Sequence, residues 1–251
     1  MKMLYAAGST MVPSFVKNHL QVWIDKGYDK REIYYDKATT VMVDSGAFSA
    51  YTKGKKVNRD EYCEFIINYR KKWLGKLKEL TFINLDVIGN PKETISNQKF
   101  FDDNNFNVLP VVHLAGFKEK RLEECLEKYP YICLGGMVGR KIKKHTIPWL
   151  NKCFSIIGKY YKKTNKMPKI HLLGMFNTFF LYRYPAYSCD STSWLKVRKF
   201  GFKPLKIPKV PSHSQNKELC LQLENRLIKQ YMIEEEKITK FWKKKGISWN
   251  D

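Results

Sequence analysis

Short apolar runs alternate with longer amphipathic segments along most of this chain. The runs cover residues 3–7, 40–43, 81–85, 108–112, 131–134, 169–173 and 186–189, with a weakly marked eighth at 202–207. Repeated strand–helix units of this kind predict a parallel sheet covered by helices. An open doubly wound sheet and a barrel both satisfy the pattern, and its seven or eight units favour a (β/α)8 TIM-type barrel.

Helical periodicity fills the intervals between these runs. One predicted helix face collects Tyr62, Phe65, Ile66, Tyr69 and Trp73. Asn58 precedes that face as a candidate N-cap, and Asn90-Pro91 has the composition of a second helix start. Further apolar stripes occur at 122–129 and 149–161, and the chain has a helical pattern from about 214 to 245.

The length of 251 residues suits one large α/β domain. Because no internal linker is visible, we expect a single domain, with the barrel over 1–212 and a C-terminal helical segment over 213–251 packed on it. A chain of this size buries roughly 70–75% of its unfolded surface, so it folds without disulfides or a structural metal.

The six cysteines show no CxxC or CxC spacing, so neither a disulfide framework nor a thiolate zinc site is predicted. Reduced thiols are typical of a cytoplasmic protein. The apolar stretch near the N-terminus is too short for a signal peptide, and no run is long enough to span a membrane. We therefore expect a cytoplasmic location, in the host cytoplasm if the source is a virus, and no membrane partner.

The charge balance points to a polyanionic partner. Lys and Arg total 46 against 24 Asp and Glu, for a net charge of +22. A field of that sign attracts nucleic acid and speeds encounter. A compositional bias with merely solvated lysines is the alternative, and a phospholipid surface is a weaker one, because no separate basic amphipathic helix is present.

Polar residues or glycines follow five of the predicted strands: Asp44, Asp86, His113, Gly135-Gly136 and Asp190. In barrels the chemistry sits at the carboxyl ends of the strands. A carboxylate there can attack an anomeric carbon while a second one handles the proton. A single aspartate in this position is more often a helix cap or turn residue, but three of them together predict a site.

The histidine and the glycines admit more than one interpretation. His113 either contacts a ligand, as a donor or an acid–base group, or is structural. The glycines at 135, 136 and 139 allow close backbone approach to a phosphate or a base carbonyl, or simply form a tight turn.

Two motifs together resemble the guanine transglycosylase superfamily, whose queuine tRNA-ribosyltransferase-like members install queuosine-type bases. Asp44-Ser45-Gly46-Ala47-Phe48 is similar to the Asp-Ser-Gly-Gly-Phe signature of these enzymes. The stretches 187–194 and 110–113 resemble the DNA-acting branch of phages and bacterial genomic islands, which inserts 7-deazaguanines into DNA. The resemblance extends from about Leu4 to Trp194.

The resemblance implies a ping-pong base exchange without a cofactor. Asp190 would attack C1′ of the target nucleoside and expel guanine, and Asp44 would be the neighbouring acid–base or positioning carboxylate. The implied substrate-binding residues are Ser45, Gly46, Asp86, His113, Gly135, Gly136 and Met137. Among them, Asp86 would bind the purine N–H edge and the glycine amides its carbonyl. His113 stands where transfer-RNA enzymes commonly carry Gln.

One departure from the bacterial transfer-RNA enzymes concerns zinc. Those enzymes carry a Cys-x-Cys-x-x-Cys cluster and a later His after the nucleophile, whereas only Cys220 and His213 follow here. We therefore expect no zinc subdomain and no metal, which favours DNA over transfer RNA as the substrate.

Two basic loops follow site motifs and are candidates for phosphate contacts: Lys53, Lys55 and Lys56, and Arg140, Lys141, Lys143 and Lys144. Solvated loops are an equal alternative. Phe48, Phe176, Tyr184 and Tyr187 could stack on a base flipped out of its strand, or belong to the core.

Three other functions remain open on the sequence. The same chemistry could act on transfer RNA. A barrel could bind nucleic acid without catalysis, as a subunit of an assembly. A metabolic barrel could bind a phosphate through Gly135 to Gly139, although this leaves the charge of +22 unexplained.

Overall fold

The structure is a computed structural model that describes residues 1–6, 15–22, 38–137, 141–193 and 217–249. The predicted strand at 202–207 and the predicted phosphate contact Arg140 lie outside these ranges. In the described ranges, no helix is both long and apolar enough to cross a membrane.

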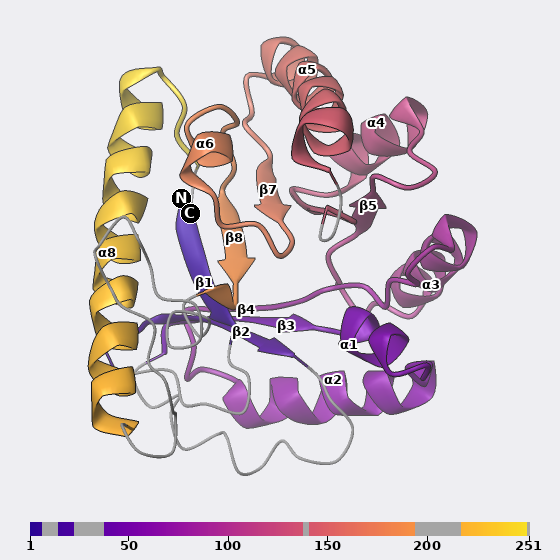
Figure 1. The fold of residues 1–251 in the computed structure, drawn as a ribbon. Coiled ribbons are helices and arrows are strands. Elements are labelled where there is room, and N and C mark those ends of the chain that lie inside the picture. Colours follow the sequence, from indigo (N-terminus) through magenta and orange to yellow (C-terminus); the bar gives the residue numbers. More distant parts are fainter. Residues whose placement is uncertain (7–14, 23–37, 138–140, 194–216, 250–251) are drawn as a thin grey trace.

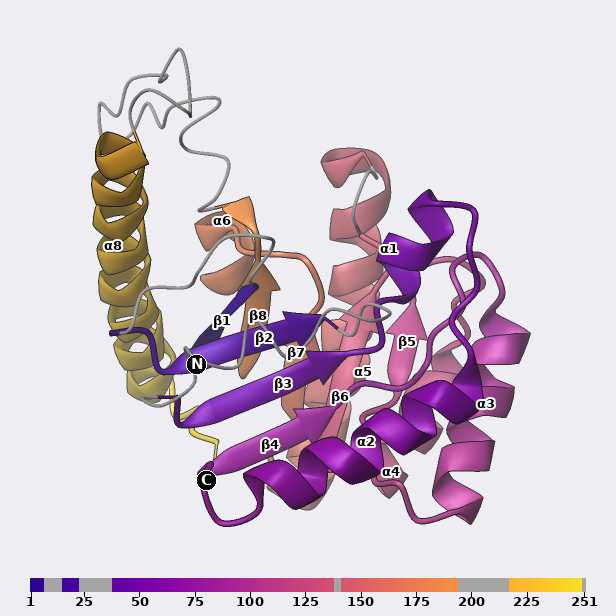
Figure 2. The same ribbon diagram turned by 90° about the horizontal axis from the view of Figure 1, so that it is seen from below.

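Eight parallel strands form one sheet at the centre of the molecule (Figure 1). They are β1 (Lys2–Ala6), β2 (Asn18–Val22), β3 (Thr40–Asp44), β4 (Glu79–Phe82), β5 (Val111–His113), β6 (Tyr131–Gly135), β7 (Lys169–Leu172) and β8 (Ser188–Ser191). Their order across the sheet is β4-β3-β2-β1-β8-β7-β6-β5, so β1 pairs with β8 and neighbours follow the chain as in a barrel. Figure 2 shows the sheet curling along this order.

The curled sheet stays open between its edge strands β4 and β5, which corrects the prediction of a closed barrel. One isolated bridge, Ile83 with Leu109, joins the two edges. Leu109 N donates to Phe82 O at 2.7 Å and Asn84 N donates to Leu109 O at 2.9 Å. Directly afterwards Asp86 N donates to Asn84 O in a turn, and no further bridge joins the two edges in the described residues.

Strand β2 was not predicted, because its sequence alternates polar and apolar residues without an apolar run. His19 lies in it and is only 2% exposed. Its Nε2 lies 2.9 Å from Val16 O, and burial lowers its pKa to about 4, so the ring is neutral at physiological pH. A neutral, hydrogen-bonded histidine can be buried in a sheet at little cost. With β2, the sheet reaches eight strands within the described residues.

Helices follow many of the strands, and most of them cover the outer side of the sheet, whereas the short helix after β3 lies beyond the carboxyl end of that strand (Figure 1 and Figure 2). They are α1 (Ala47–Thr52), α2 (Arg59–Trp73), α3 (Pro91–Asp103), α4 (Glu119–Lys128), α5 (Ile147–Thr164), α6 (Thr178–Leu181) and α8 (Lys217–Lys244), with a π-helical turn over Ile142–Thr146 before α5. Both predicted N-caps are confirmed. Asn58 accepts from the backbone N–H groups of Asp60 and Glu61, and Asn90 from that of Glu93.

Side chains alternate between two environments along each strand, as the pleat requires. In β1, Met3 and Tyr5 pack outward among the helices, whereas Leu4 and Ala6 join the interior cluster of the curled sheet. Leu4 is the register partner of Asp190 in β8, and register partners in a parallel pair share a face. Asp190 therefore points into the interior.

The C-terminal helix α8 lies along the β1 side of the sheet (Figure 1). Trp242 Nε1 donates to Leu181 O at 2.8 Å, and Tyr5 OH donates to Ile228 O at 3.3 Å. Leu227 and Ile228 are at most 1% exposed in the outer core. The helix therefore covers the outer face beside β1 and β8.

Candidate active site

The carboxyl ends of the strands surround a cavity of about 560 Å³. Three carboxylates line it: Asp44 at the end of β3, Asp86 in the loop after β4, and Asp190 in β8. His113, the last residue of β5, and Gly136, just after β6, line it as well. Because parallel strands end at one rim, residues that are distant in the sequence meet there.

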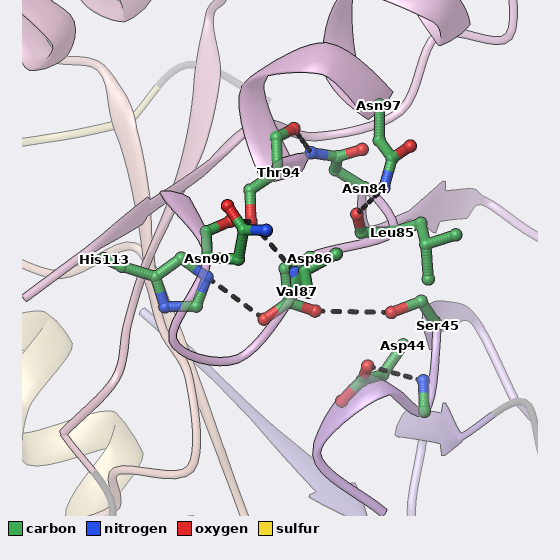
Figure 3. A network of polar contacts seen from close by, with 11 residues as sticks. Asp44, Ser45, Asn84, Leu85, Asp86, Val87, Asn90, Thr94, Asn97 and His113 are labelled. Atoms are coloured by element: carbon green, nitrogen blue, oxygen red, sulfur yellow. Dashed lines mark hydrogen bonds and ion pairs between the residues drawn. The ribbon is translucent and has the colours of Figure 1, made fainter. Parts of the chain in front are cut away.

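Asp44 is half-buried in the cavity wall, and Gly46 N donates to its Oδ1 at 2.9 Å (Figure 3). Gly46 has a φ of 75°, a conformation that favours glycine, and this turn directs its N–H back to the carboxylate. Burial, followed by the charge of Asp86, raises the pKa of Asp44 to about 7, and the charge of Asp190 adds to the rise. A carboxyl group with this pKa can give and take a proton near neutral pH.

Asp86 lies between Ser45 and His113 (Figure 3). Ser45 Oγ donates to Asp86 Oδ1 at 3.4 Å. His113 Nε2 lies 3.2 Å from Asp86 Oδ2, close enough for an ion pair but not aligned as a hydrogen bond. The Asp86 carboxylate is therefore placed by one residue from each neighbouring strand end.

The loop between β4 and α3 is held by side chains of that helix (Figure 3). Asn97 Nδ2 donates to Leu85 O, and Val87 N donates to Thr94 Oγ1, both at 2.9 Å. Asn84 Nδ2 donates to Thr94 O at 2.9 Å. These bonds connect the backbone on both sides of the carboxylate to helix α3.

Asp190 is only 6% exposed, and two nitrogen atoms lie within hydrogen-bond distance of one of its oxygens. Gly174 N donates to Oδ1 at 2.7 Å, and His171 Nε2 lies 3.1 Å from the same atom. In the described part of the chain, no residue forms a hydrogen bond or ion pair with Oδ2. Because Asp190 lines the cavity, this second oxygen is the one left for a ligand.

A buried polar chain lies behind Asp190, and it was not predicted from the sequence. His171 Nδ1 lies 2.6 Å from Ser188 Oγ, which lies 2.5 Å from Tyr131 OH. His171 is fully buried and pairs in register with Ser188. A signal was available: His171 interrupts an apolar run, and Ser188 stands two residues before Asp190, on the same face of its strand.

The two adjacent glycines have different surroundings. Gly136 lines the cavity with a φ of 80°, and a Cβ there would lie 3.4 Å from His113 Nδ1. Gly135 does not line the cavity, and its Cβ would come within 3.0 Å of Leu173 Cδ1. Met137 is 2% exposed and belongs to the outer core. Gly135 is therefore required by the close packing of Leu173, and Met137 faces away from the cavity. Gly136 is the residue of this turn that lines the cavity.

The other predicted site residues lie around this cavity or outside it. Ser45 donates a hydrogen bond to Asp86 and Gly46 N donates one to Asp44, but neither residue lines the cavity. Among the candidate aromatics, Phe48 and Phe176 line it, whereas Tyr184 and Tyr187 are 3% exposed core residues. Two of the four aromatics are thus available to a base.

The described lysines of both predicted basic loops are exposed: Lys53, Lys55, Lys56, Lys141, Lys143 and Lys144. Lys55 and Lys56 line a second cavity of about 500 Å³, together with Arg59. This cavity shares Asp86 and Ile88 with the first one, so the two are adjacent. The lysines therefore lie next to the cavity that contains the three carboxylates.

No protein-family model matches the chain. A search of curated proteins also finds no match. Within the described ranges, no group of three or more His, Cys, Asp or Glu residues is arranged to hold a metal ion. The geometry of the cavity and the two sequence motifs are therefore the features that bear on function.

Proposed function

We propose that this protein is a base-exchange glycosyltransferase that replaces guanine in DNA with a 7-deazaguanine, such as 7-cyano-7-deazaguanine. The observation that carries the proposal is the cavity with carboxylates from three strand ends. One of them, Asp190, is held at one oxygen by Gly174 N and His171 Nε2, with its second oxygen free in the described part of the chain. Another, Asp44, has a pKa of about 7. Environments that differ in this way divide nucleophilic and acid–base roles between carboxylates.

In the first half-reaction, Asp190 Oδ2 attacks C1′ of the target nucleotide. The bond between C1′ and N9 breaks, and its electron pair leaves with guanine. Asp44, protonated below a pH of about 7, gives its proton to the departing base. The products are a glycosyl ester of Asp190, neutral guanine and an ionised Asp44.

In the second half-reaction, a 7-deazaguanine occupies the site that guanine has left. The Asp44 carboxylate takes the proton from its N9, and N9 attacks C1′. The ester bond to Asp190 breaks and its electron pair returns to the carboxylate. One guanine is released for each base inserted, and the cycle involves no oxidation or reduction.

Base recognition is assigned to the wall that carries Asp86. Its carboxylate can accept N–H groups of the purine edge, and Ser45 and His113 hold it in place. Phe48 and Phe176 offer apolar contact for the ring. A volume of about 560 Å³ lies within the range of small-molecule sites and accommodates a base with its sugar.

Three features support a polymer as the substrate. The net charge is +22, exposed lysines lie at the adjacent cavity, and the two cavities share Asp86 and Ile88 in their walls. A nucleotide must leave its stack to reach a cavity of this kind, and unpairing costs a few kcal/mol. Contacts of Lys55 and Lys56 with neighbouring phosphates would offset this cost.

The deciding experiment measures incorporation of labelled 7-deazaguanine and guanine into DNA, followed by nucleoside mass spectrometry. The wild type should exchange the base and form a trappable covalent adduct with DNA. Asp190→Asn should do neither. Asp103→Asn, an exposed carboxylate in the last turn of α3, is the matched control and should retain activity. An absence of incorporation with any 7-deazaguanine in any nucleic acid would refute the proposal.

Transfer RNA is the second candidate substrate, and a parallel assay on both polymers separates the two. DNA is preferred because the zinc motif of the bacterial transfer-RNA enzymes is missing from the sequence. In this proposal the open, curled sheet is a metal-free variant of the TIM-type barrel. A non-catalytic binding protein would instead bind DNA without base release, before and after Asp190→Asn.

A further inference from the structure

The interior of the curled sheet contains a column of polar groups directly behind Asp190. From the cavity downward the column consists of Asp190, His171, Ser188 and Tyr131, contributed by β8, β7 and β6. None of the four is more than 6% exposed. A buried polar chain is costly unless each member is hydrogen-bonded, so its continuity calls for an explanation.

The donors and acceptors of this column fit one arrangement of protons. An ionised Asp190 only accepts, so His171 Nε2 carries the hydrogen toward Oδ1. His171 Nδ1 then accepts from the Ser188 hydroxyl, and Ser188 Oγ accepts from Tyr131 OH. Burial raises the pKa of Tyr131 well above its usual value, so the phenol keeps its proton.

The other arrangements leave a group without its partner. A doubly protonated His171 would donate to Ser188, whose hydroxyl would then turn toward Tyr131. Among the described residues, Tyr131 OH has no other acceptor, so its proton would be buried unpaired. The tautomer with hydrogen on Nδ1 would place the Nε2 lone pair against a carboxylate oxygen. The neutral Nε2–H form satisfies all four groups.

We propose that His171 is the positioning residue of the nucleophile. Through this chain it holds Asp190 Oδ1, together with Gly174 N, and so leaves Oδ2 as the oxygen that attacks C1′. The inference rests on the proposed base exchange for its kinetic consequence, but not for its geometry. An offset of about 1 Å in a reacting group can cost on the order of 100-fold in rate.

The first test is spectroscopic and independent of activity. Nitrogen NMR of ¹⁵N-histidine-labelled protein should show the His171 resonances, assigned by their loss in His171→Gln, in the pattern of a neutral Nε2–H tautomer at neutral pH. Ser188→Ala should shift its Nδ1 resonance, and Asp190→Asn its Nε2 resonance. A resonance of the Nδ1–H tautomer, or one insensitive to both substitutions, would overturn the inference.

The second test uses three substitutions at His171. Gln can place an amide N–H near the position of Nε2, Asn places one near Nδ1, and Leu supplies none. We expect His171→Leu and His171→Asn to lower kcat about 100-fold with KM for DNA nearly unchanged, and His171→Gln to recover much of the loss. Equal losses in all three, or a change confined to KM, would contradict a positioning role.

Tyr131→Phe is the matched control at the far end of the column. It removes one hydroxyl, keeps the ring contact with Tyr187, and should lower kcat only a few-fold. Thermal unfolding of each variant separates loss of folding from loss of positioning. If the wild type exchanges no base although the His171 resonances shift in Ser188→Ala and Asp190→Asn, the proposed chemistry is wrong and the His171–Asp190 contact is confirmed. If exchange occurs but the His171 resonances do not shift in these variants, only the inference about His171 is wrong.

Discussion

The cavity has two sides that surround the same type of side chain in different ways. On the β3 and β4 side, Asp44 and Asp86 lie near each other, and burial and mutual charge raise the pKa of Asp44 to about 7. On the β7 and β8 side, Asp190 is bonded to His171 and Gly174, with a buried hydrogen-bond chain behind it. The first side holds a movable proton, and the second holds a fixed oxygen.

The residues around each aspartate, and not the residue type, therefore determine whether its carboxyl group has a raised pKa or a fixed orientation. Crowding with another carboxylate favours the protonated form, and N–H donors orient an oxygen. A nucleophile must be fixed relative to C1′, whereas an acid–base group must change its protonation state within each cycle. The two sides of the cavity meet these two requirements separately.

The largest expected effect is the loss of activity in Asp190→Asn, which can be compared with Asp44→Asn on the other side of the cavity. Asp190→Asn should abolish the covalent adduct and lower exchange on the order of 10⁴-fold or more, because the attacking oxygen is lost. Asp44→Asn should slow both half-reactions by about 10²–10⁴-fold but still permit slow formation of the adduct. Quenched-flow trapping of the adduct measures both. If Asp44→Asn removed the adduct and Asp190→Asn retained it, the assignment would be reversed.

Asp86→Asn tests whether the first side also recognises the base. Replacing one acceptor oxygen by an N–H group should weaken binding of free guanine or 7-deazaguanine by about 10–100-fold, since a mismatched donor leaves polar groups unpaired. Isothermal titration calorimetry gives the affinity. Equal affinity in the variant would remove Asp86 from base recognition. Asp103→Asn again serves as the control at an exposed position.

The pKa of Asp44 predicts opposite pH profiles for the two half-reactions. Guanine expulsion requires the protonated form, so its rate should fall about tenfold per pH unit above a pH of about 7. Insertion of the 7-deazaguanine requires the ionised form, so its rate should fall below that pH. Single-turnover measurements from pH 5 to 9 resolve the two. Parallel profiles would show that Asp44 does not transfer the proton.

The same shift affects stability. The folded pKa of about 7 lies above the ordinary value of 3.8, so between these values the folded state retains a proton that the unfolded state releases. Stability from this group is therefore present below about pH 4 and is lost as the pH rises to 7. We expect Asp44→Asn to be more stable than the wild type at pH 8 by about 1–2 kcal/mol, allowing for solvent screening in the cavity, and less so at pH 5. Urea unfolding at the two pH values tests this.

The smallest effect concerns residues outside both sides. Replacing Lys55 and Lys56 by Gln should raise KM for DNA several-fold. It should also reduce the slope of log binding constant against log salt concentration by the equivalent of about 1–2 phosphate contacts. The affinity for the free base should not change. Lys162→Gln with Lys163→Gln, at the end of α5, removes the same charge elsewhere and is the control. Identical salt slopes for the two pairs would show that the lysines at the second cavity contact no phosphate.

Local patterns in the sequence predicted the elements whose signals are local. Strands β3, β6 and β7, the caps Asn58 and Asn90, and the C-terminal helix all follow from apolar runs, helical periodicity and capping residues. The positions of Asp44, Asp86 and Asp190 at strand ends could be predicted for the same reason, because parallel strands bring these ends together.

The missed features lack a strong local signal in the sequence. Strand β2 has no apolar run, and its buried His19 is hydrogen-bonded to Val16 O, three residues earlier. His171 gained significance only through Ser188 and Asp190 on the neighbouring strand, which are distant in the sequence. The opening between β4 and β5 coincides with a turn at Asn84 that has no marked turn sequence.

The open edge has a mechanical consequence for the cavity. Two hydrogen bonds of one bridge, at Asn84 and Leu109, are the backbone bonds described between the two edges beside the wall that carries Asp86, whereas β8 is laddered on both edges, to β1 and β7. Segments with few backbone bonds separate at the lowest free energy. We therefore expect a bulkier ligand to widen the circumference at this seam and to leave the position of Asp190 unchanged.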